Sequence, residues 1–403
     1  MIPLQDRISG RKHKDTFELI SKQDTISKIE LLEQTKLSVS TLTRILDELR
    51  DQGFILEAGF GESTGGRRPI LYRTNPSYGY LFGLEISRTY SMILLCDMHM
   101  NKLDSRRWAM HEGMTPKVLV EEIVYTVRHM LTVHGIQLTS VLGMGIGAVG
   151  PLDRFSGTIL EPLYFQANGW SHVPICEMLE QELTFPIFLD NGANMAILGE
   201  YWASCNQPYQ HMLYVHLGVG IRSAMMIGGK VVYGAVDMEG SVGQMIIQTD
   251  GPRLRESSNF GCLENYTTIF ALEQQARTKI KQGRPTALKE MSDLEKYPAR
   301  IQFSHLTRAF EEKDPMVTEL FTQAATYFGI GLANLLNILH PEKVILGGPL
   351  VSFNPTFFAT STEVAMQKSQ HNPTYQVVFS QGTLGEDALV TGAAVLVVNK
   401  LIE

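Results

Sequence analysis

The stretch SKIELLEQTKLSVSTLTRILDEL, residues 27–49, determines how the start of this chain folds. Ser27 is followed three residues later by Glu30, which is the capping-box pattern that begins a helix. We expect this helix to end near Thr35, and we expect Ser38 to cap a second helix. The apolar faces would be formed by Ile29, Leu31 and Leu32 in the first helix and by Val39, Leu42, Ile45, Leu46 and Leu49 in the second. The stretch therefore predicts a helix-turn-helix.

The polar face of the second helix is the candidate DNA-contacting surface. A preceding helix at about residues 12–23, with Phe17, Leu19 and Ile20, would complete a small three-helix core. In a helix-turn-helix, the N-terminal residues of the second helix enter the major groove. The candidate DNA contacts in the turn and on this helix are Lys36, Ser38, Ser40, Thr41, Thr43 and Arg44. Taken alone, the three helices would also fit a protein-interaction module.

The residues that follow predict a β-hairpin. Residues 53–57 and 69–73 have strand character, and a glycine-rich segment at 59–66 connects them. The glycines at its tip allow close backbone approach, and two arginines there can enter a narrow A·T minor groove. The candidate contacts at the tip are Gly65, Gly66, Arg67 and Arg68. A plain basic turn is the alternative for the tip alone, but the helices and hairpin together indicate a winged helix-turn-helix over residues 1–76.

Charge is unevenly distributed along the 403 residues, whose net charge is −7. Residues 1–76 contain 12 lysines and arginines against 11 aspartates and glutamates, so the acidic excess lies in residues 77–403. This distribution suits a small DNA-binding face next to an acidic domain. The sequence contains no apolar run of about 18 residues and no signal-peptide pattern, so we expect a cytoplasmic protein without membrane contact. Its four cysteines lack paired spacing and predict neither disulfides nor a metal site.

Beyond residue 77, short apolar runs alternate with helical stretches. Strands are expected at 80–86, 91–97, 141–147 and 186–190, and a helix is expected at about 117–133. This alternation is typical of an α/β fold.

Glycine-containing motifs occur in a fixed order along the same region: Gly143-Met144-Gly145-Ile146-Gly147, Asn168-Gly169-Trp170, Asp190-Asn191-Gly192-Ala193-Asn194, Gly218-Val219-Gly220, Gly261-Cys262-Leu263-Glu264, Gly347-Gly348 and Gly392-Ala393-Ala394. With the helix-turn-helix and wing, they resemble the ROK family, named for repressors, open reading frames and kinases. The resemblance implies an actin-like (RNase H-like), two-lobed, sugar-kinase-type α/β domain over 77–403. Its first lobe would comprise 77–195 and a C-terminal helix at about 386–403, and its second lobe 196–385.

The kinase motifs of the family are altered in this chain. ROK kinases begin with an Asp-x-Gly-Gly-Thr phosphate loop, whereas the matching residues 85–90 contain no glycine. The second phosphate turn, usually Gly-Thr-Gly-x-Gly, is 218–222 here and lacks its hydroxyl residue and last glycine. The family's catalytic aspartate is replaced by Gly192, which has no side chain to accept a proton. The resemblance therefore implies a kinase-like domain that is catalytically inactive.

Metal and sugar motifs of the family differ as well. Its structural zinc uses one histidine and three cysteines, but Gln244, Arg255 and Ser257 replace three of them and leave Cys262. A closed zinc site needs four such ligands, so we expect no metal and no cofactor, and a loop held by hydrogen bonds and packing. The sugar contacts that the resemblance implies are partly retained. The candidate effector-binding residues are Asn168, Asp190, Asn191, Gln244 and Glu264.

Together these features predict a transcriptional repressor of carbohydrate-related genes that responds to a sugar or sugar-like effector. We expect a homodimer or homotetramer that binds double-stranded DNA at an A·T-rich inverted repeat. The alternative is a ROK sugar kinase with a fused regulatory DNA-binding head. A third possibility is a constitutive DNA-binding protein whose C-terminal domain is structural.

Overall fold

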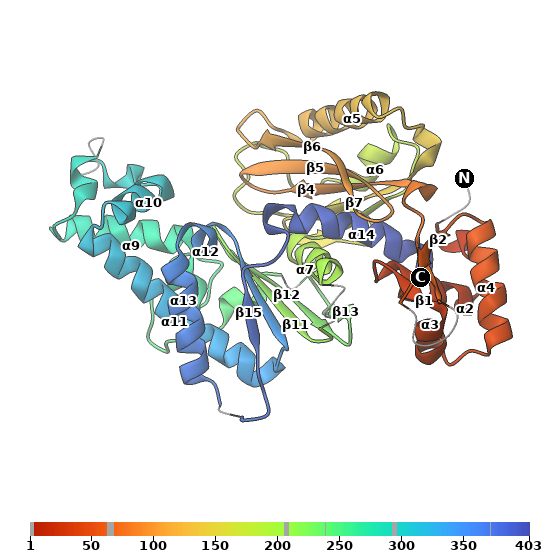
Figure 1. The fold of residues 1–403 in the computed structure, drawn as a ribbon. Helices are drawn as coiled ribbons and strands as arrows, with labels where there is room; N and C mark the ends of the chain where they lie inside the picture. Colours follow the sequence, from red (N-terminus) through yellow and green to blue (C-terminus); the bar gives the residue numbers. More distant parts are fainter. Residues whose placement is uncertain (1–3, 63–67, 205–208, 238, 292–295, 371) are drawn as a thin grey trace. The chain divides into compact units, whose positions relative to one another are not determined.

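The computed structural model describes residues 4–62, 68–204, 209–237, 239–291, 296–370 and 372–403 (Figure 1). The chain forms two compact units. The first comprises Met1–Pro208 together with Glu386–Glu403, and the second comprises Tyr209–Gly385. Each unit is built on one five-stranded sheet. Among the helices that the structure describes, none is both long and apolar enough to cross a lipid bilayer.

The N-terminal part of the first unit is a winged helix-turn-helix. Its elements are α1 (Leu4–Arg7), α2 (Arg11–Ser21), β1 (Ile26–Ser27), α3 (Lys28–Thr35), α4 (Val39–Asp51), β2 (Ile55–Phe60) and β3 (Ile70–Thr74), with sheet order β1-β3-β2. Ser27 Oγ accepts the N–H of Glu30, and the Glu30 carboxylate accepts the N–H of Ser27, which closes the predicted capping box. The Ser27 N–H that donates to this carboxylate, together with a side-chain hydrogen bond from Ser27, lowers the pKa of Glu30. Both predicted helix starts, at Ser27 and Ser38, are confirmed.

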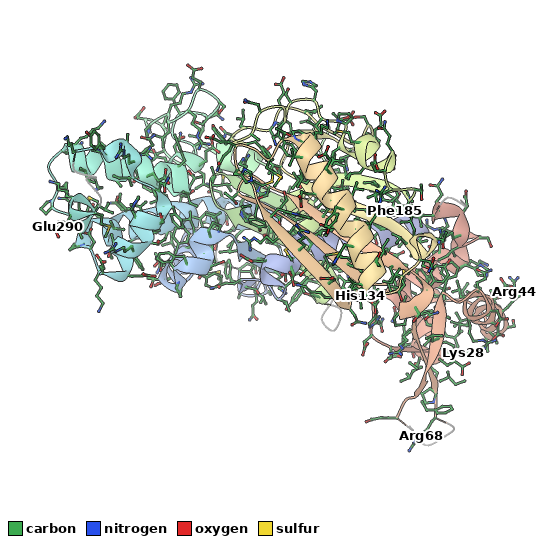
Figure 2. The ribbon with its side chains drawn as sticks, turned by 90° about the horizontal axis from the view of Figure 1, so that it is seen from above. Lys28, Arg44, Arg68, His134, Phe185 and Glu290 are labelled. Atoms are coloured by element: carbon green, nitrogen blue, oxygen red, sulfur yellow. The ribbon has the colours of Figure 1, made fainter. Side chains whose placement is uncertain are left out.

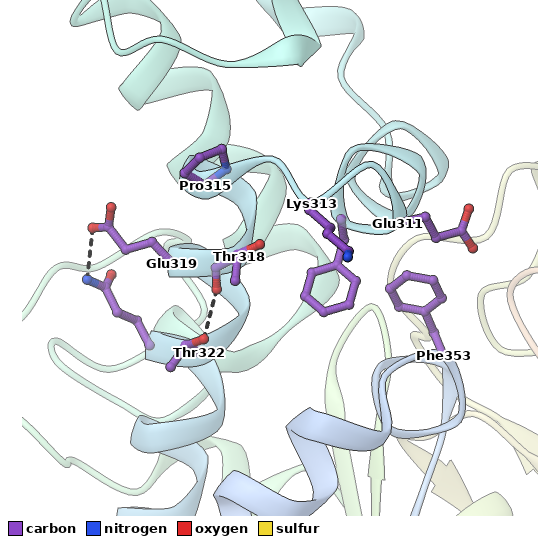
Figure 3. A pocket seen from close by; sticks show the side chains of 9 residues that line it. Glu311, Lys313, Pro315, Thr318, Glu319, Thr322 and Phe353 are labelled. Atoms are coloured by element: carbon purple, nitrogen blue, oxygen red, sulfur yellow. Dashed lines mark hydrogen bonds between the residues drawn. The ribbon is translucent and has the colours of Figure 1, made fainter.

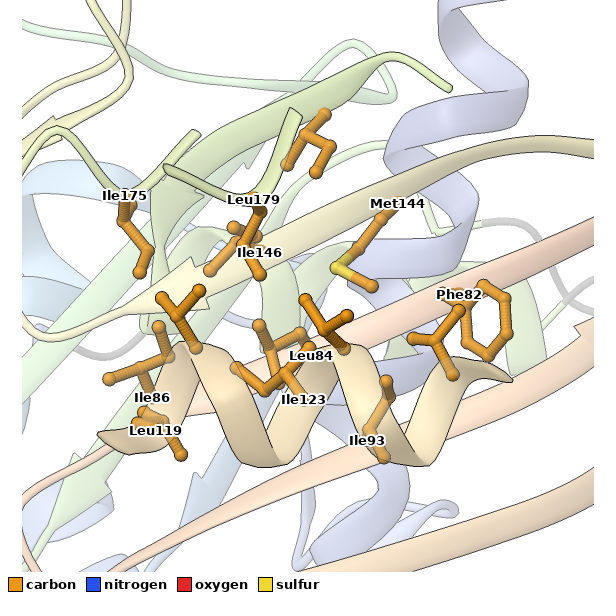
Figure 4. Close-up of a cluster of buried hydrophobic side chains, with 14 of the residues drawn as sticks. Phe82, Leu84, Ile86, Ile93, Leu119, Ile123, Met144, Ile146, Ile175 and Leu179 are labelled. Atoms are coloured by element: carbon orange, nitrogen blue, oxygen red, sulfur yellow. The ribbon is translucent and has the colours of Figure 1, made fainter. Parts of the chain in front are cut away.

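The rest of the first unit is an α/β lobe. Its elements are η1 (Pro76–Tyr78), β4 (Tyr80–Ile86), β5 (Tyr90–Asp97), β6 (Lys102–Ala109), α5 (Pro116–Val133), η2 (Leu138–Ser140), β7 (Val141–Ala148), β8 (Leu152–Asp153), β9 (Thr158–Ile159), α6 (Ile175–Glu180), β10 (Ile187–Asn191), α7 (Gly192–Ala203) and α14 (Ala388–Ile402). The sheet order is β10-β7-β4-β5-β6. One sheet face buries Leu84 and Ile146 in a core that includes Ile123 of α5 and Leu179 of α6 (Figure 4). The strands and helix predicted between residues 80 and 191 are therefore confirmed.

Helix α14 lies close against both the sheet and α7 because glycines stand at the crossing points. A Cβ atom on Gly145 of β7 would lie 1.8 Å from the carbonyl oxygen of Ala393. One on Gly392 would lie 1.7 Å from the carbonyl oxygen of Met195 in α7. Both distances are far inside van der Waals contact, so only glycine fits at either position. Most of α14 is apolar and buried, as expected for a helix surrounded by protein.

The same helix extends the hydrophobic core into the winged helix-turn-helix. A single cluster of buried side chains contains Leu4, Phe17 and Ile20 from the N-terminal helices, Leu94 from β5, and Val390, Ala394 and Leu401 from α14. At the edge of this region, Nε2 of His99 lies 3.0 Å from Oδ1 of Asp24. The winged helix-turn-helix and the first sheet therefore share one core.

The second unit is also an α/β arrangement. Its elements are β11 (Met212–Leu217), β12 (Ile221–Ile227), β13 (Lys230–Val231), η3 (Ser241–Gln244), α8 (Glu264–Thr267), α9 (Ile269–Lys281), η4 (Ala287–Glu290), η5 (Pro298–Arg300), α10 (Phe303–Glu311), α11 (Pro315–Leu339), β14 (Lys343–Gly347), α12 (Pro349–Phe353), α13 (Pro355–Lys368) and β15 (Val378–Ser380), and the 3-10 turn η6 (Gly385–Asp387) follows. The sheet order is β13-β12-β11-β14-β15. A surface hollow of about 950 Å³, lined by Phe310, Lys313 and Phe353 among others, lies beside α11 (Figure 3).

Candidate DNA-binding face and effector residues

Helix α4, the second helix of the motif, begins with a well-defined cap. Ser38 Oγ accepts the N–H of Thr41 at 3.3 Å, and it lies 2.8 Å from Thr41 Oγ1 and 3.2 Å from Ser40 Oγ. Lys36, in the preceding turn, has a left-handed φ of 54°, and its N–H donates to the carbonyl oxygen of Leu32. The turn therefore ends α3 and sets the start of α4 through hydrogen bonds between residues two to four positions apart.

The predicted DNA contacts on the turn and α4 lie at the surface. The exposed ones are Lys36, Ser38, Ser40 and Arg44, and the half-buried ones are Thr41 and Thr43. Arg44 pairs with Glu48 at 3.2 Å, a surface ion pair of small energy that a phosphate can replace. Lys28 Nζ donates to Thr43 Oγ1 at 2.5 Å, so α3 adds a cation to this face that the sequence analysis did not include (Figure 2).

Two residues assigned to the apolar faces are exposed instead. Val39 is 59% exposed and Ile29 is 57% exposed, so the prediction that they belong to the core was wrong. In α4 the buried stripe begins one turn later, at Leu42. Leu37, just before the cap, packs against the core in place of Val39, which is the arrangement of a hydrophobic staple with Leu42.

The wing is an antiparallel pair of β2 and β3. Their register joins Ile55 to Thr74, and a bulge interrupts it between Glu57 and Phe60. Arg68 is exposed and lies at the outer end of the hairpin (Figure 2). The other predicted tip contacts, Gly65, Gly66 and Arg67, lie outside the described residues.

Asn168, one of three predicted effector residues in the first unit, is exposed. Beside it, Trp170 is buried, and its indole N–H donates to the carbonyl oxygen of Met114 at 3.1 Å. The Trp170 ring stacks on Phe165 with centroids 4.6 Å apart. The loop around Asn168 is therefore anchored by a buried aromatic residue, while Asn168 itself faces solvent.

Asp190 and Asn191 are buried at the junction of β10 and α7. Asp190 Oδ1 accepts the N–H of Asn191 at 2.7 Å and the side-chain amide of Asn194 at 2.9 Å. Asn191 Oδ1 caps α7 by accepting the N–H of Asn194 at 2.8 Å. A carboxylate at a helix N-terminus is stabilised by the helix dipole. This Asp190 oxygen therefore holds the first turn of α7, in which Gly192 is buried and offers no carboxylate.

Gln244 and Glu264, the other two predicted effector residues, lie in the second unit. Gln244 Oε1 accepts the N–H of Asn259 at 2.9 Å, and the side-chain amide of Asn259 donates to the Gln244 carbonyl at 3.2 Å. Glu264 begins α8, and one of its carboxylate oxygens would lie 3.2 Å from a Cβ atom on Gly243. Glu264 thus lies next to the η3 turn that contains Gln244.

A hydrogen-bond network holds the loop at 252–262, where the family motif has zinc ligands. The buried Asn265 is its centre: its amide donates to the carbonyl oxygens of Pro252 and Asn259, both at 2.8 Å, and its Oδ1 accepts Ser258 Oγ at 3.0 Å. Arg253 adds a bond from Nε to the Ser258 carbonyl at 2.8 Å. Among the described residues, no group of three or more His, Cys, Asp or Glu side chains could hold a metal ion. The network also fixes Asn259 against Gln244.

Both turns that match the family's phosphate loops are closed by their own hydrogen bonds. Between β4 and β5, the N–H of Ser87 donates to the carbonyl oxygen of Tyr90 at 3.2 Å. The next residue, Arg88, donates from Nε to the Leu163 carbonyl at 2.8 Å. Between β11 and β12, the N–H of Gly218 donates to the Gly220 carbonyl at 3.1 Å. A phosphate loop needs such N–H groups directed at the nucleotide, whereas these are bonded within the protein.

Comparisons with known proteins agree with this arrangement. The ROK family model matches residues 81–400, and a winged helix-turn-helix DNA-binding model matches residues 11–55. The xylose repressor of Caldicellulosiruptor bescii is 27% identical over 377 residues, which cover 94% of this chain and 92% of that repressor.

Solved structures extend the likeness to the fold. A ROK family transcriptional regulator, a homologue of the E. coli MLC protein, has a TM-score of 0.78 at 20% identity and covers 98% of this chain and all of its own. A ROK family glucokinase from Streptomyces griseus, in complex with glucose and AMPPNP, has a TM-score of 0.65 at 25% identity, covering 79% of this chain and 99% of its own. The glucokinase covers less of this chain than the regulator does. The chain therefore belongs to the ROK family, with a winged helix-turn-helix ahead of its ROK domain.

Proposed function

We propose that this protein is a DNA-binding transcriptional repressor of carbohydrate-related genes. Residues 1–76 contact DNA, and residues 77–403 respond to a sugar or sugar-like effector without catalysing phosphoryl transfer. The observation that carries the proposal is the exposed face on α4, where a capped helix start presents hydroxyls together with Lys36 and Arg44. Similarity over nearly the full length of a xylose repressor supports the same function.

The DNA partner follows from the geometry of the motif. A single helix-turn-helix contacts one half-site, so two copies related by a two-fold axis require an inverted repeat. Arginines of a wing prefer the narrow minor groove of A·T-rich DNA, whose negative potential is strongest. We therefore propose a homodimer or homotetramer on an A·T-rich inverted repeat, with Arg68 and its neighbours Gly65, Gly66 and Arg67 at the minor groove.

Arg44→Ala and Arg68→Ala should each weaken DNA binding by about tenfold. Each substitution removes a cation that lies against a phosphate or a base. The dependence of log affinity on log salt should therefore flatten by about one unit for each phosphate that the variant no longer neutralises. The measurement is the affinity for a duplex that the wild-type protein selects from a random library, taken at several salt concentrations.

Arg128→Ala is the matched control for these variants. The Arg128 side chain is 61% exposed, close to the 67% of Arg44, and it likewise pairs with a glutamate, but it lies on α5 outside the winged helix-turn-helix. The control should bind with wild-type affinity and salt dependence. Equal losses for Arg128→Ala and Arg44→Ala would show that net charge alone matters and would contradict the proposed face.

We propose that the effector contacts Gln244 and Glu264, which lie close together in the second unit. Asn168, Asp190 and Asn191 in the first unit stay predicted effector residues on the family motif alone. Amide groups donate hydrogen bonds to sugar hydroxyls and accept hydrogen bonds from them, and carboxylates accept them. Of these residues, Glu264 lies next to the turn that contains Gln244, and its carboxylate is a strong acceptor at a half-buried position. Its side chain is therefore the best one to test.

Glu264→Ala should abolish the response of DNA binding to sugar while leaving ligand-free DNA binding unchanged. The probes are D-xylose and D-glucose, and the readout is the affinity for the selected duplex with and without each sugar. If a sugar weakens DNA binding tenfold, linkage requires that DNA weaken sugar binding tenfold. Glu256→Ala, which removes an exposed carboxylate from the nearby loop, is the control and should respond like wild type. A wild-type response in Glu264→Ala would place the effector elsewhere.

A further inference from the structure

Val39 is the exposed apolar residue of α4. Its side chain is 59% exposed, whereas the other apolar residues of this fully described helix, Leu42, Ile45, Leu46 and Leu49, are at most 2% exposed. Leu37 already packs against the core at this end of the helix, so packing does not require Val39. Valine is also a weaker helix former than alanine, so helix stability does not explain it either.

Polar and cationic residues lie near Val39 on this face. Its sequence neighbours Ser38 and Ser40 are exposed. One turn along, Thr43 Oγ1 donates to the Val39 carbonyl at 2.6 Å and accepts from Lys28 Nζ at 2.5 Å. A dry apolar protein interface would strip water from the charged Lys28 ammonium and from the exposed Ser38 and Ser40 hydroxyls, at a cost in free energy. The major groove instead offers them base acceptors and phosphates.

The groups on the base edges of DNA determine what an exposed valine at this position can recognise. N-terminal residues of the second helix are the ones that reach base edges. In the major groove, the apolar group on those edges is the C5 methyl of thymine. Serine and threonine hydroxyls pair with donors or acceptors alike, so they discriminate less between bases.

We propose, on the basis of the DNA binding proposed above, that Val39 recognises a thymine by packing against its C5 methyl group. This contact determines the base preference at one position of each half-site. Val39 is therefore a specificity-determining residue, whereas Arg44 and Lys36 contribute mainly affinity through phosphates.

Deoxyuridine substitution tests this contact directly, because deoxyuridine pairs like thymidine but lacks the methyl group. In the duplex selected by the wild-type protein, each thymine is replaced in turn and affinities are measured at one salt concentration. At one thymine of each half-site, wild-type affinity should fall by about fourfold, the value expected for one buried methyl group. Val39→Ala should bind the thymine and deoxyuridine forms equally, and Ser40→Ala should retain the wild-type difference.

Every outcome is decisive. Alanine favours helix, so Val39→Ala should fold, and its far-ultraviolet circular dichroism should match wild type. If the wild type selects no duplex, the proposed DNA binding fails and the inference fails with it. If Val39→Ala binds the selected duplex but keeps the wild-type difference at every thymine, the repressor function stands and the inference is wrong. A changed oligomeric state with an unchanged thymine preference would assign Val39 to a contact between copies and would also overturn it.

Discussion

Replacing Gly392 by alanine should lower the free energy of unfolding of the first unit by about 3 kcal/mol, the upper end of the range for overpacking. Alanine normally stabilises a helix interior by about 1 kcal/mol relative to glycine. At this crossing, however, the new Cβ atom would lie 1.7 Å from the Met195 carbonyl oxygen and 2.7 Å from the Gly199 nitrogen. Backbone atoms cannot rotate out of the way as a side chain can, so α14 would have to move off α7.

Thermal unfolding followed by circular dichroism measures this effect. A loss of this size should lower the midpoint by about 10 °C in a unit of this length. Gly240→Ala is the matched control, because a Cβ atom there has no atom within 4 Å. An unchanged midpoint for Gly392→Ala would mean that α14 and α7 do not pack this closely.

Sugar phosphorylation should be undetectable with purified protein, ATP, Mg²⁺ and either D-glucose or D-xylose. Phosphoryl transfer needs an acceptor for the proton of the sugar hydroxyl, and Gly192 offers none. Loss of a general base typically reduces rate by about 10²–10⁴-fold. The N–H groups of Ser87 and Gly218 are bonded to backbone carbonyls. They therefore contribute less to stabilising the negative charge of the transferred phosphoryl group. Turnover should therefore lie at least about 10³-fold below the 1–100 s⁻¹ of ordinary kinases.

Gly192→Asp distinguishes the two expected causes of inactivity, which are the missing general base and the altered phosphate turns. It restores a carboxylate at the start of α7 but leaves both phosphate turns unchanged, and its unfolding midpoint reports whether the variant folds. We expect it to remain inactive, because the turn at 85–90 still contains no glycine and the turn at 218–222 still lacks its hydroxyl residue and last glycine. Wild-type turnover in the ordinary kinase range would instead support a sugar kinase with a fused DNA-binding head.

The sequence predicted the winged helix-turn-helix well because the interactions that begin its helices join residues close together in the chain. The Ser27 and Ser38 caps need only residues three positions away, and both are present. Val39 was misassigned for the same reason: helical spacing places it on the apolar face, but spacing alone does not reveal where along the helix the core begins. The point at which the core begins depends on Leu37, which precedes the helix and packs against the core.

For the candidate effector site, the sequence indicated which residues to consider but not what each of them does in the structure. The family motif marks Asp190 and Gln244, but only the structure shows their partners. Asp190 holds the start of α7 through Asn194, and Gln244 is bonded to Asn259 in a loop that Asn265 organises. Residue type does not mark these partners, because asparagine is common in loops and helix caps of every kind. Such roles depend on which loop folds against which, and spacing along the sequence does not contain that information.

The core shared by the winged helix-turn-helix and α14 has a consequence for synthesis. The two are separated by more than about 300 residues in the sequence. At about 5–20 residues per second, a ribosome would make α14 roughly 15–65 s after β3. During that time the buried faces of Leu4, Phe17 and Ile20 lack their partners Val390 and Leu401. A nascent or prematurely terminated chain would thus have an incomplete core beneath its DNA-binding helices, and it would be a substrate for proteases before it could occupy DNA.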